Sequence, residues 1–448
     1  MSSFMTTFMM VVFCSTVLFI MWRPKGINET IPTAIGAALI LMVGIVPITD
    51  LKVIAGIISG ATITILSTII MSIILDSIGF FKWVALNIIK KSRGSGVLLY
   101  FYIILLCFLM TMFFNNDGSI LITTPIIIRI LTLLNLKMHQ KIPYLISGAL
   151  IATAASAPIA VSNIANLIAL KIVGLNLNDY VKMMFVPSMV GIMTITFLLF
   201  YYFRSDIPKK IGINHQVKSS YSPSLHPLIT PQKTIEVDWK LLKICMLIIV
   251  VTRGSFFLLS PFGIPIEWLA ILGAVILVFV RWYHTREGVT DIIKKTPWHI
   301  LIFAFSMYVL VYGLRNIGFN SLLVEWLKEW ITSHHLNASL IMGLLLTIMS
   351  NLFNNLPAVM IGTLTLTDMG LDVPTLQIAY LANVIGSDIG ALLTPVGTLA
   401  TLIWMFLLRQ HGIKISWRSY IKVTIMVIPI GLIVSLLGLY FWINWLFY

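Results

Sequence analysis

The sequence predicts an all-α protein that crosses a membrane many times, and three observations support this fold class. Of the 448 residues, 59% are hydrophobic and only 10% are charged, whereas a soluble domain carries about 25% charged residues. Apolar runs of about 20 residues, the length that spans a bilayer, recur along the chain. The basic residues lie mostly between these runs, although the net charge is +14. This distribution excludes a soluble enzyme, a disordered protein and a nucleic-acid-binding protein.

The apolar runs fall into two halves of similar size. The first half, residues 1–203, contains predicted helices within 5–80, an amphipathic arm at 81–93, a hairpin at 94–136, a broken helix at 144–170 and a helix at 183–203. The second half, residues 244–448, contains predicted helices within 244–314, an arm at 317–335, a hairpin at 337–368, a broken helix at 377–408 and a helix at 423–446. Between them, the polar stretch 204–243 has four prolines and seven basic residues and is predicted to be a linker.

The two halves repeat one pattern in the same order. The first half reads Phe-Asn-Asn-Asp at 114–117, and the second reads Phe-Asn-Asn-Leu at 353–356. About 35 residues after each Asn pair comes a helix that small residues and proline interrupt, at 152–166 and at 387–401. Matching breaks in two halves of a membrane protein are typical of inverted-repeat transporters.

The basic residues indicate how the chain is oriented. If each Asn pair forms the tip of a re-entrant hairpin, each half has five spans, so the protein has ten spans and two hairpins. With the linker in the cytoplasm and both termini outside, 23 of the 30 basic residues lie inside and five outside, as the positive-inside rule requires. Arg129 and Arg253 remain within apolar runs; Arg129 is expected to extend toward the interface, and no role is assigned to Arg253.

The Asn pairs are the first candidate binding residues. Asn115 and Asn116 in one half, and Asn354 and Asn355 in the other, are expected at hairpin tips near the middle of the membrane. Free backbone groups are tolerated there only where protein or a wet cavity surrounds them. An Asn side chain both donates and accepts hydrogen bonds without adding charge. The alternative is that each pair only caps the helix that follows it.

The broken helices supply the second set of candidates. Pro158 and Pro395 each interrupt a helix and free backbone carbonyls one turn earlier. Helix ends of this kind present dipoles and bare carbonyls to a substrate or an ion. The candidate binding residues beside the breaks are Ser162, Asn163, Thr394 and Thr398.

Carboxylates inside apolar runs are functional candidates by default. Asp117 falls at the first hairpin tip, and Asp388 begins the broken segment of the second half. A carboxylate in a low-dielectric cavity can bind and release a proton, so both are predicted to couple transport to protons; the alternative is helix capping or a buried hydrogen bond. Asp76 is expected at the cytoplasmic interface. The three isolated cysteines predict no disulfide and no metal site, and no cofactor is expected.

At these residues the sequence resembles the ion-transporter superfamily, and within it the bacterial arsenical pump membrane protein family. The resemblance rests on FFNNDGSILITTPIII at 113–128, APIAVSNIANLIA at 157–169, NLFNNLPAVM at 351–360 and NVIGSDIGALLTPVGTLATLIW at 383–404. It implies a homodimer in the bacterial inner membrane, elevator-type movement of a transport domain against a scaffold, and export of arsenite or antimonite against protons. It also allows a cytoplasmic ATPase subunit as a partner.

The resemblance carries over substrate contacts motif by motif. They would be Asn115, Asn116, Asp117, Asn163, Asn355, Asp388, Thr394 and Thr398. Some members of the family have Cys beside the Asp of the last motif, whereas this chain has Ser387. No cysteine lies near either tip, so arsenite would be recognised as the neutral trihydroxide through hydroxyl and amide groups. The residue set, which contains no Arg or Lys, suits a small neutral polyol or a cation.

Two further functions compete with arsenite export. A sodium/proton antiporter, or another small-solute carrier of the superfamily, would use the same carboxylates and free carbonyls. An intramembrane aspartyl protease would use Asp117 and Asp388, but neither lies in a GxGD motif, and the repeated Asn tips would then have no explanation. No HExxH and no phosphate-binding loop motif is present, so the chain is not predicted to be an enzyme.

Overall fold

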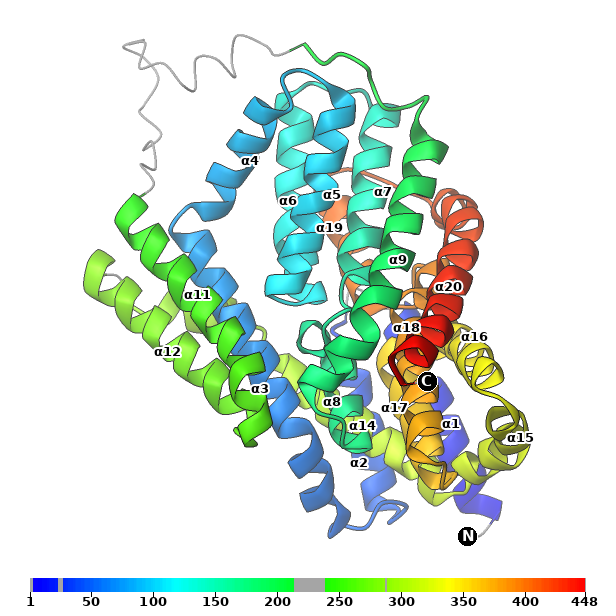
Figure 1. Ribbon diagram of the computed structural model, residues 1–448. Helices are drawn as coiled ribbons and strands as arrows, with labels where there is room; N and C mark the ends of the chain where they lie inside the picture. The colour runs from blue at the N-terminus through cyan, green and yellow to red at the C-terminus, as the bar shows by residue number, and fades with distance from the viewer. Residues whose placement is uncertain (1–2, 23–26, 213–237, 287, 448) are drawn as a thin grey trace.

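The computed structural model describes residues 3–22, 27–212, 238–286 and 288–447, and it is helical over most of these ranges (Figure 1). Within them, eleven helices are long and apolar enough to cross a membrane. The prediction of an all-helical, multi-pass membrane protein is therefore confirmed. Most of the predicted linker, residues 213–237, lies outside the described residues.

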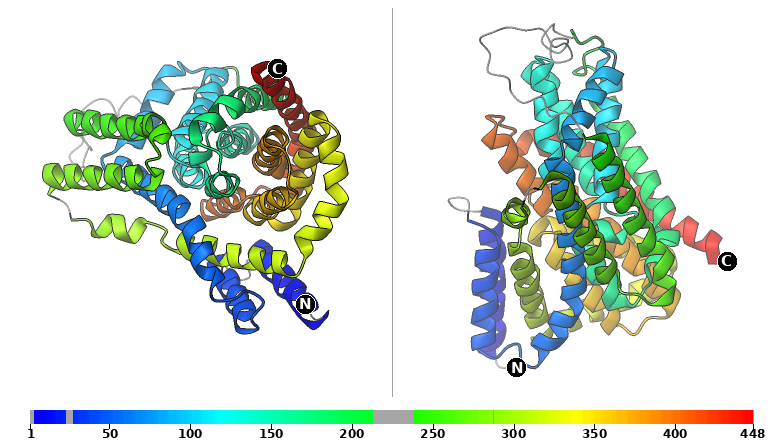
Figure 2. Two further views of the ribbon diagram at one scale, coloured as in Figure 1. Left: turned by 60° about the horizontal axis from the view of Figure 1, so that its bottom comes forward. Right: turned by 90° about the vertical axis from the view of Figure 1, so that its left-hand side faces the viewer.

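Seven helices form what we call the outer helix group. They are α1 (Ser3–Trp22), α2 (Thr30–Met42), α3 (Asp50–Ser77), α11 (Trp239–Leu259), α12 (Ile266–Thr285), α13 (Thr290–Lys295) and α14 (His299–Asn316). Within this group α12 packs along α3, and α14 packs against α2 and α3. One end of the pair α11–α12 extends outward in the left view of Figure 2, while α12 packs along α3.

Within the predicted helical region 5–80, α2 is a short helix. The helix ends at Met42, because Gly44 adopts a left-handed conformation (φ +76°) and Pro47 follows three residues later. At 13 residues α2 is about 20 Å long, shorter than the hydrocarbon core of a bilayer. One of its ends, at Glu29, is therefore buried inside the protein.

Ten helices form the central helix group. They are α5 (Gly96–Phe113), α6 (Asn116–Leu133), α7 (Met138–Ala154), α8 (Ile164–Val173), α9 (Leu177–Phe203), α16 (His335–Phe353), α17 (Asn355–Asp368), α18 (Val373–Asp388), α19 (Leu399–Gln410) and α20 (Trp417–Phe447). Helices from the two halves of the sequence interleave here: α9 packs along α20, α8 on α17, and α6 on α19. The halves therefore share one core.

Two amphipathic helices connect the groups. Both α4 (Phe80–Lys91) and α15 (Phe319–Ser333) begin after a glycine in the left-handed conformation, Gly79 (φ +80°) and Gly318 (φ +90°). α15 exposes Trp326 and Trp330, residues that favour the membrane–water interface.

Helices are interrupted at four places in the central group. α7 stops at Ala154 and the chain continues through the short helix η2 (Ala160–Ser162) to α8, because Pro158 has no N–H to extend the helix. α18 stops at Asp388 and continues through η4 (Gly390–Leu393) to α19. The other two interruptions are the turns from α5 to α6 and from α16 to α17; the first lies near mid-height in Figure 1, away from the ends of the molecule.

α18, which carries Asp388, has a well-defined start. The Asp372 side chain accepts the N–H of Thr375 at 3.2 Å and caps the helix. Hydrogen bonding with Thr375 holds the pKa of Asp372 below its ordinary value, so the cap is a carboxylate at neutral pH. A negative charge at a helix N-terminus is favourable, and this cap fixes where α18 begins.

Candidate functional site

Asp388 is fully buried and accepts three side-chain hydrogen bonds from the first half of the sequence. Asn163 Nδ2 donates to Oδ1 at 2.8 Å, while Ser156 Oγ and Asn166 Nδ2 donate to Oδ2 at 2.9 and 2.6 Å. All three donors lie at the break between α7 and α8. The end of α18 and the first broken helix therefore meet through one carboxylate.

Tyrosine hydroxyls satisfy backbone carbonyls that the breaks leave free. Tyr180 donates to the carbonyl of Ala157 at 2.6 Å, beside the first break. Tyr420 donates to the carbonyl of Leu392 at 3.1 Å, beside the second. Buried backbone groups are almost always paired, and these bonds make both breaks stable parts of the native fold.

The second hairpin tip is bonded to the second break. Asn354 Nδ2 donates to the carbonyl of Val396 at 3.2 Å. Its backbone has φ +78° and ψ 154°, a region that is essentially restricted to glycine. Asn351, one turn earlier, accepts the N–H of Thr394 at 2.8 Å and donates to the carbonyl of Gly390 at 2.9 Å. Tip and break thus form one bonded unit.

The first hairpin tip is held mainly by local bonds. Asn115 Oδ1 accepts the N–H of Gly118 at 2.5 Å, and Asn116 Oδ1 accepts the N–H of Asp117 at 2.7 Å. Asn115 therefore does cap α6, as the alternative reading of the sequence proposed, but its side-chain nitrogen has no partner. Capping alone leaves that donor unexplained.

Two other carboxylates, Glu29 at the start of α2 and Asp388 at the end of α18, lie in the surroundings of Asp117. Glu29 is buried, and its Oε1 lies 3.9 Å from Nε2 of the partly exposed His299.

Several buried polar atoms at the site have no hydrogen-bond partner among the described residues. They are Asn115 Nδ2, Ser162 Oγ, Asn166 Oδ1 and Thr394 Oγ1. An unpaired buried polar group costs about 1–3 kcal/mol, so such a set is what a bound polar ligand or water would satisfy. Thr398 differs, because its hydroxyl pairs with that of Thr401 at 2.8 Å and caps α19. Asn355 is buried beside its tip.

Among the described residues, no group of three or more His, Cys, Asp or Glu side chains could hold a metal ion. Cys107 and Cys245 are buried and Cys14 is exposed. The candidate binding and proton-coupling residues carry amide, hydroxyl and carboxylate groups.

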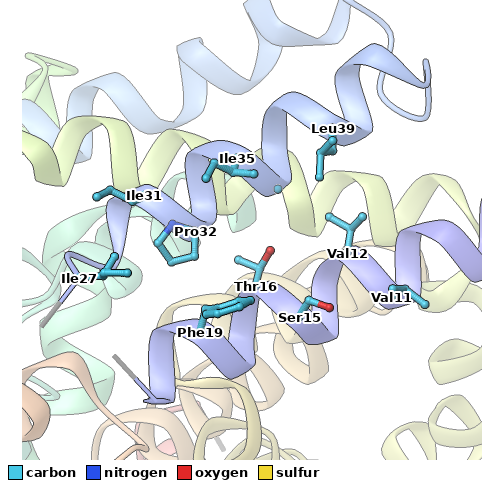
Figure 3. A pocket seen from close by; sticks show the side chains of 11 residues that line it. Val11, Val12, Ser15, Thr16, Phe19, Ile27, Ile31, Pro32, Ile35 and Leu39 are labelled. Carbon is cyan, nitrogen blue, oxygen red and sulfur yellow. The ribbon is translucent and has the colours of Figure 1, made fainter. Parts of the chain in front are cut away.

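A cavity of about 400 Å³ lies elsewhere, between α1 and α2 (Figure 3). Side chains such as Val11, Phe19 and Ile35 line it, and Ser15 and Thr16 add two hydroxyls. A hydrophilic solute would find few partners there, so this cavity does not compete with the buried polar cluster as the candidate site.

Sequence reasoning missed some of these residues. Ser156 stands two residues before Pro158, and Asn351 stands one helical turn before the second tip, so their positions beside a break and a tip were available signals. Glu29 gave no signal, because a carboxylate between two apolar runs is usually in solvent. Arg253, whose Nη2 donates to the carbonyl of Phe114 at 2.6 Å, brings a cation to the first tip. The sequence assigned no role to Arg253, and its position beside this tip came only from the structure.

A multi-pass helical protein that buries carboxylates and amides at breaks in its helices belongs to the class of membrane transport proteins. The family model for the arsenical pump membrane protein matches residues 8–443. The chain therefore belongs to the arsenical pump membrane protein family.

Individual relatives agree with this assignment. A Bacillus subtilis (strain 168) protein, whose name assigns it provisionally as an arsenical pump membrane protein, is 50% identical over 441 residues, covering 98% of this chain and 100% of the relative. The arsenical pump membrane protein of Escherichia coli (strain K12) is 34% identical over 420 residues, covering 94% and 95%. A 46 kDa membrane protein of Mycobacterium leprae (strain TN) is 21% identical over 428 residues, covering 94% and 95%.

Proposed function

We propose that this protein exports arsenite or antimonite from the cell in exchange for protons, by movement of the central helix group against the outer group. The observation that carries the proposal is the carboxylate of Asp388, bonded to three donors of the other half and close to polar atoms without partners. Membership in the arsenical pump family makes the arsenical the expected substrate.

The donor set favours a small neutral substrate. Arsenite at neutral pH is a trihydroxide, and its hydroxyls can both donate and accept hydrogen bonds. The unpaired Asn115 Nδ2, Ser162 Oγ and Thr394 Oγ1 offer the complementary groups. The three cysteines lie in α1, α5 and α11, and none of them bonds to these groups. Recognition therefore proceeds through hydrogen bonds, with Asn116, Asn163, Asn354, Asn355 and Thr398 shaping the tips and helix ends around the substrate.

Proton coupling follows from the hydrogen bonds of Asp388. An ionised carboxylate only accepts hydrogen bonds, and the three donors Ser156, Asn163 and Asn166 suit that form. When a proton binds Oδ2, which already accepts bonds from Ser156 and Asn166, that oxygen becomes a donor and one of these two donors must turn away or accept instead. The hydroxyl of Ser156 can rotate to accept, whereas the amides of Asn163 and Asn166 cannot without a flip. Protonation thus changes the bond that joins the two halves, and Asp117 is the second proton site.

Movement, topology and assembly complete the proposal. The breaks and tips would travel with the central group while the outer group stays fixed in the lipid bilayer. We place ten spans and two re-entrant hairpins in an inverted repeat, both termini outside the inner membrane and the 204–243 linker in the cytoplasm. The protein acts as a homodimer, and an ATPase subunit would bind on the basic cytoplasmic face.

A sodium/proton antiporter is the second candidate. The unpaired oxygens Asn166 Oδ1, Ser162 Oγ and Thr394 Oγ1 are ligands that a sodium ion accepts. Asn166 is bonded to Asp388, whose carboxylate could balance the charge of a bound cation.

Transport in everted membrane vesicles separates the two candidates. With labelled arsenite and an imposed pH gradient, acid inside, vesicles that contain the protein should accumulate arsenite, and collapsing the gradient should abolish the accumulation. Vesicles with the D117N/D388N double variant serve as the matched control. Arsenite movement that is absent with every gradient, together with sodium uptake driven by the pH gradient, would replace the first candidate by the second.

A further inference from the structure

Arg253 is a buried cation in α11 for which the proposed transport chemistry assigns no role. Its side chain is only 7% exposed. Nη2 donates to the backbone carbonyl of Phe114 at 2.6 Å, across 139 positions of sequence. Phe114 ends α5 and immediately precedes Asn115. A charged side chain of the outer helix group therefore reaches the first hairpin tip in the central helix group.

Contacts within the outer helix group hold the Arg253 guanidinium in place. Its Cζ lies 5.4 Å from the ring centroid of Phe256, one turn further along α11, a distance at which a cation and an aromatic face attract each other. Thr252, the preceding residue, lies so close to Gly273 of α12 that no Cβ would fit there. α11 therefore packs tightly on α12 at this level, and the position of Arg253 is set by the outer group.

The group that accepts the Arg253 bond is the carbonyl of Phe114, which has no partner within α5. The last carbonyls of an α-helix have no partner within the helix, and the negative end of its dipole lies there. A cation is the favoured partner at this end. Arg253 thus satisfies the end of α5 at the residue next to the capping Asn115, and the position of that Asn depends on a side chain from the other helix group.

Other polar contacts also join the two groups, but they lie nearer the surface. Arg315 of α14 pairs with Asp368 of α17, and their side chains are 36% and 27% exposed. Lys171 Nζ donates to the carbonyl of Gly56 at 2.6 Å in an exposed contact. The Arg253 bond differs, because it is buried and ends at the candidate site itself.

We propose that Arg253 is a positioning residue for this site: its guanidinium holds the first hairpin tip in place from the outer helix group and releases it when the groups shift. The inference rests on the proposed transport function, since it concerns the same site. It adds a residue outside the repeated motifs that controls where Asn115 and its neighbours stand.

A measurement without substrate tests the position of the tip. The reporter is S119C, a buried position in the first turns of α6, in a chain with C14S, C107A and C245A. We expect R253M to raise the rate of maleimide labelling of S119C at least fivefold, because the tip loses its support. R315M, which removes a partly exposed contact between α14 and α17, should change the rate less than twofold. Equal labelling rates in R253M and the parent would overturn the proposal.

Lysine and glutamine variants keep the test decisive if R253M does not fold. R253K retains a cation that can donate to the carbonyl, whereas R253Q removes the charge and shortens the side chain. We expect R253Q to label at least threefold faster than R253K. Identical rates for the two variants would also overturn the proposal.

Transport kinetics distinguish positioning from a purely structural role. R253M should raise the KM for arsenite about tenfold, while Vmax stays within threefold and R253K lies between. A KM equal to that of the parent would contradict the positioning role. If the parent protein moves no arsenite, the proposed function fails, yet the labelling rates still decide the role of Arg253.

Discussion

Replacing Asp388 by Asn tests the centre of the proposed mechanism. The side chain keeps its shape, but one oxygen becomes an NH₂ group that only donates. If the remaining oxygen stays on the Oδ2 side, it keeps the bonds from Ser156 and Asn166, and the new NH₂ faces Nδ2 of Asn163, also a donor. Asn163 cannot flip freely, because its oxygen caps α8 at the N–H of Ala165.

The expected magnitude follows from these bonds. One charge-assisted hydrogen bond is lost, which corresponds to about 1.5–3 kcal/mol, and the two bonds that remain become neutral and weaker. We therefore expect D388N to fold with a lower unfolding temperature in detergent. Its pH-gradient-driven arsenite accumulation should fall at least about 100-fold, because an amide cannot carry the proton at neutral pH.

S156A is the matched control for this variant. It removes one of the three donors but keeps the carboxylate, so the free energy of unfolding should fall by no more than about 1–2 kcal/mol. Gradient-driven transport should stay within about tenfold of the parent, because one lost hydrogen bond is worth about that factor. The assay is the everted-vesicle measurement with labelled arsenite, normalised to protein content. Gradient-driven accumulation at the parental rate in the D117N/D388N double variant would refute the assignment of these carboxylates as proton carriers.

Three further predictions concern stability and are measured by thermal unfolding of the purified protein in detergent. Asn354 has a glycine-like backbone conformation that costs about 1–3 kcal/mol. Because N354G and N354A lose the same side-chain hydrogen bond to Val396, the glycine variant should be more stable than the alanine variant by about 1 kcal/mol or more. The reverse order would contradict the backbone strain. G191A places a methyl group against the hydroxyl of Ser435, so it should cost about 1–3 kcal/mol; the double variant G191A/S435A should recover most of the loss, and no recovery would show that the clash lies elsewhere. The partly exposed Arg315–Asp368 pair should be worth no more than about 1 kcal/mol, so R315M and D368N should each unfold close to the parent, whereas a loss of several kcal/mol would require a buried role for this pair.

Much of the architecture could be read from the sequence, because it depends on local rules. The apolar runs predicted the helices, and the positions of Pro158 and Pro395 indicated where helices are interrupted, since a proline blocks the hydrogen bond that would extend them. The Asn pairs indicated the turns between α5 and α6 and between α16 and α17. The end of α2 at Met42 also has a local cause, because Gly44 and Pro47 follow it in the sequence.

The partners of the site residues were decided by the tertiary structure. The sequence could mark Asp388 and Asn163 as candidates, but their contact joins residues 225 positions apart. Asn351, Glu29 and Arg253 were not recognised as neighbours of the tips and breaks. Their roles depend on which helices pack together. The hydrophobic pattern of a membrane helix indicates which of its residues are buried, but it does not determine which other helix packs against them.

The sequence by itself thus determined that this is an all-helical membrane protein, where its helices break, and which polar residues stand at the breaks. Only the tertiary structure decided that a carboxylate of one half is bonded by three donors of the other, and that a buried arginine of the outer group supports the first tip. The physical reason is one of range. Helix formation and capping are settled within a few residues of chain, whereas hydrogen bonds between buried side chains exist only after distant helices have packed.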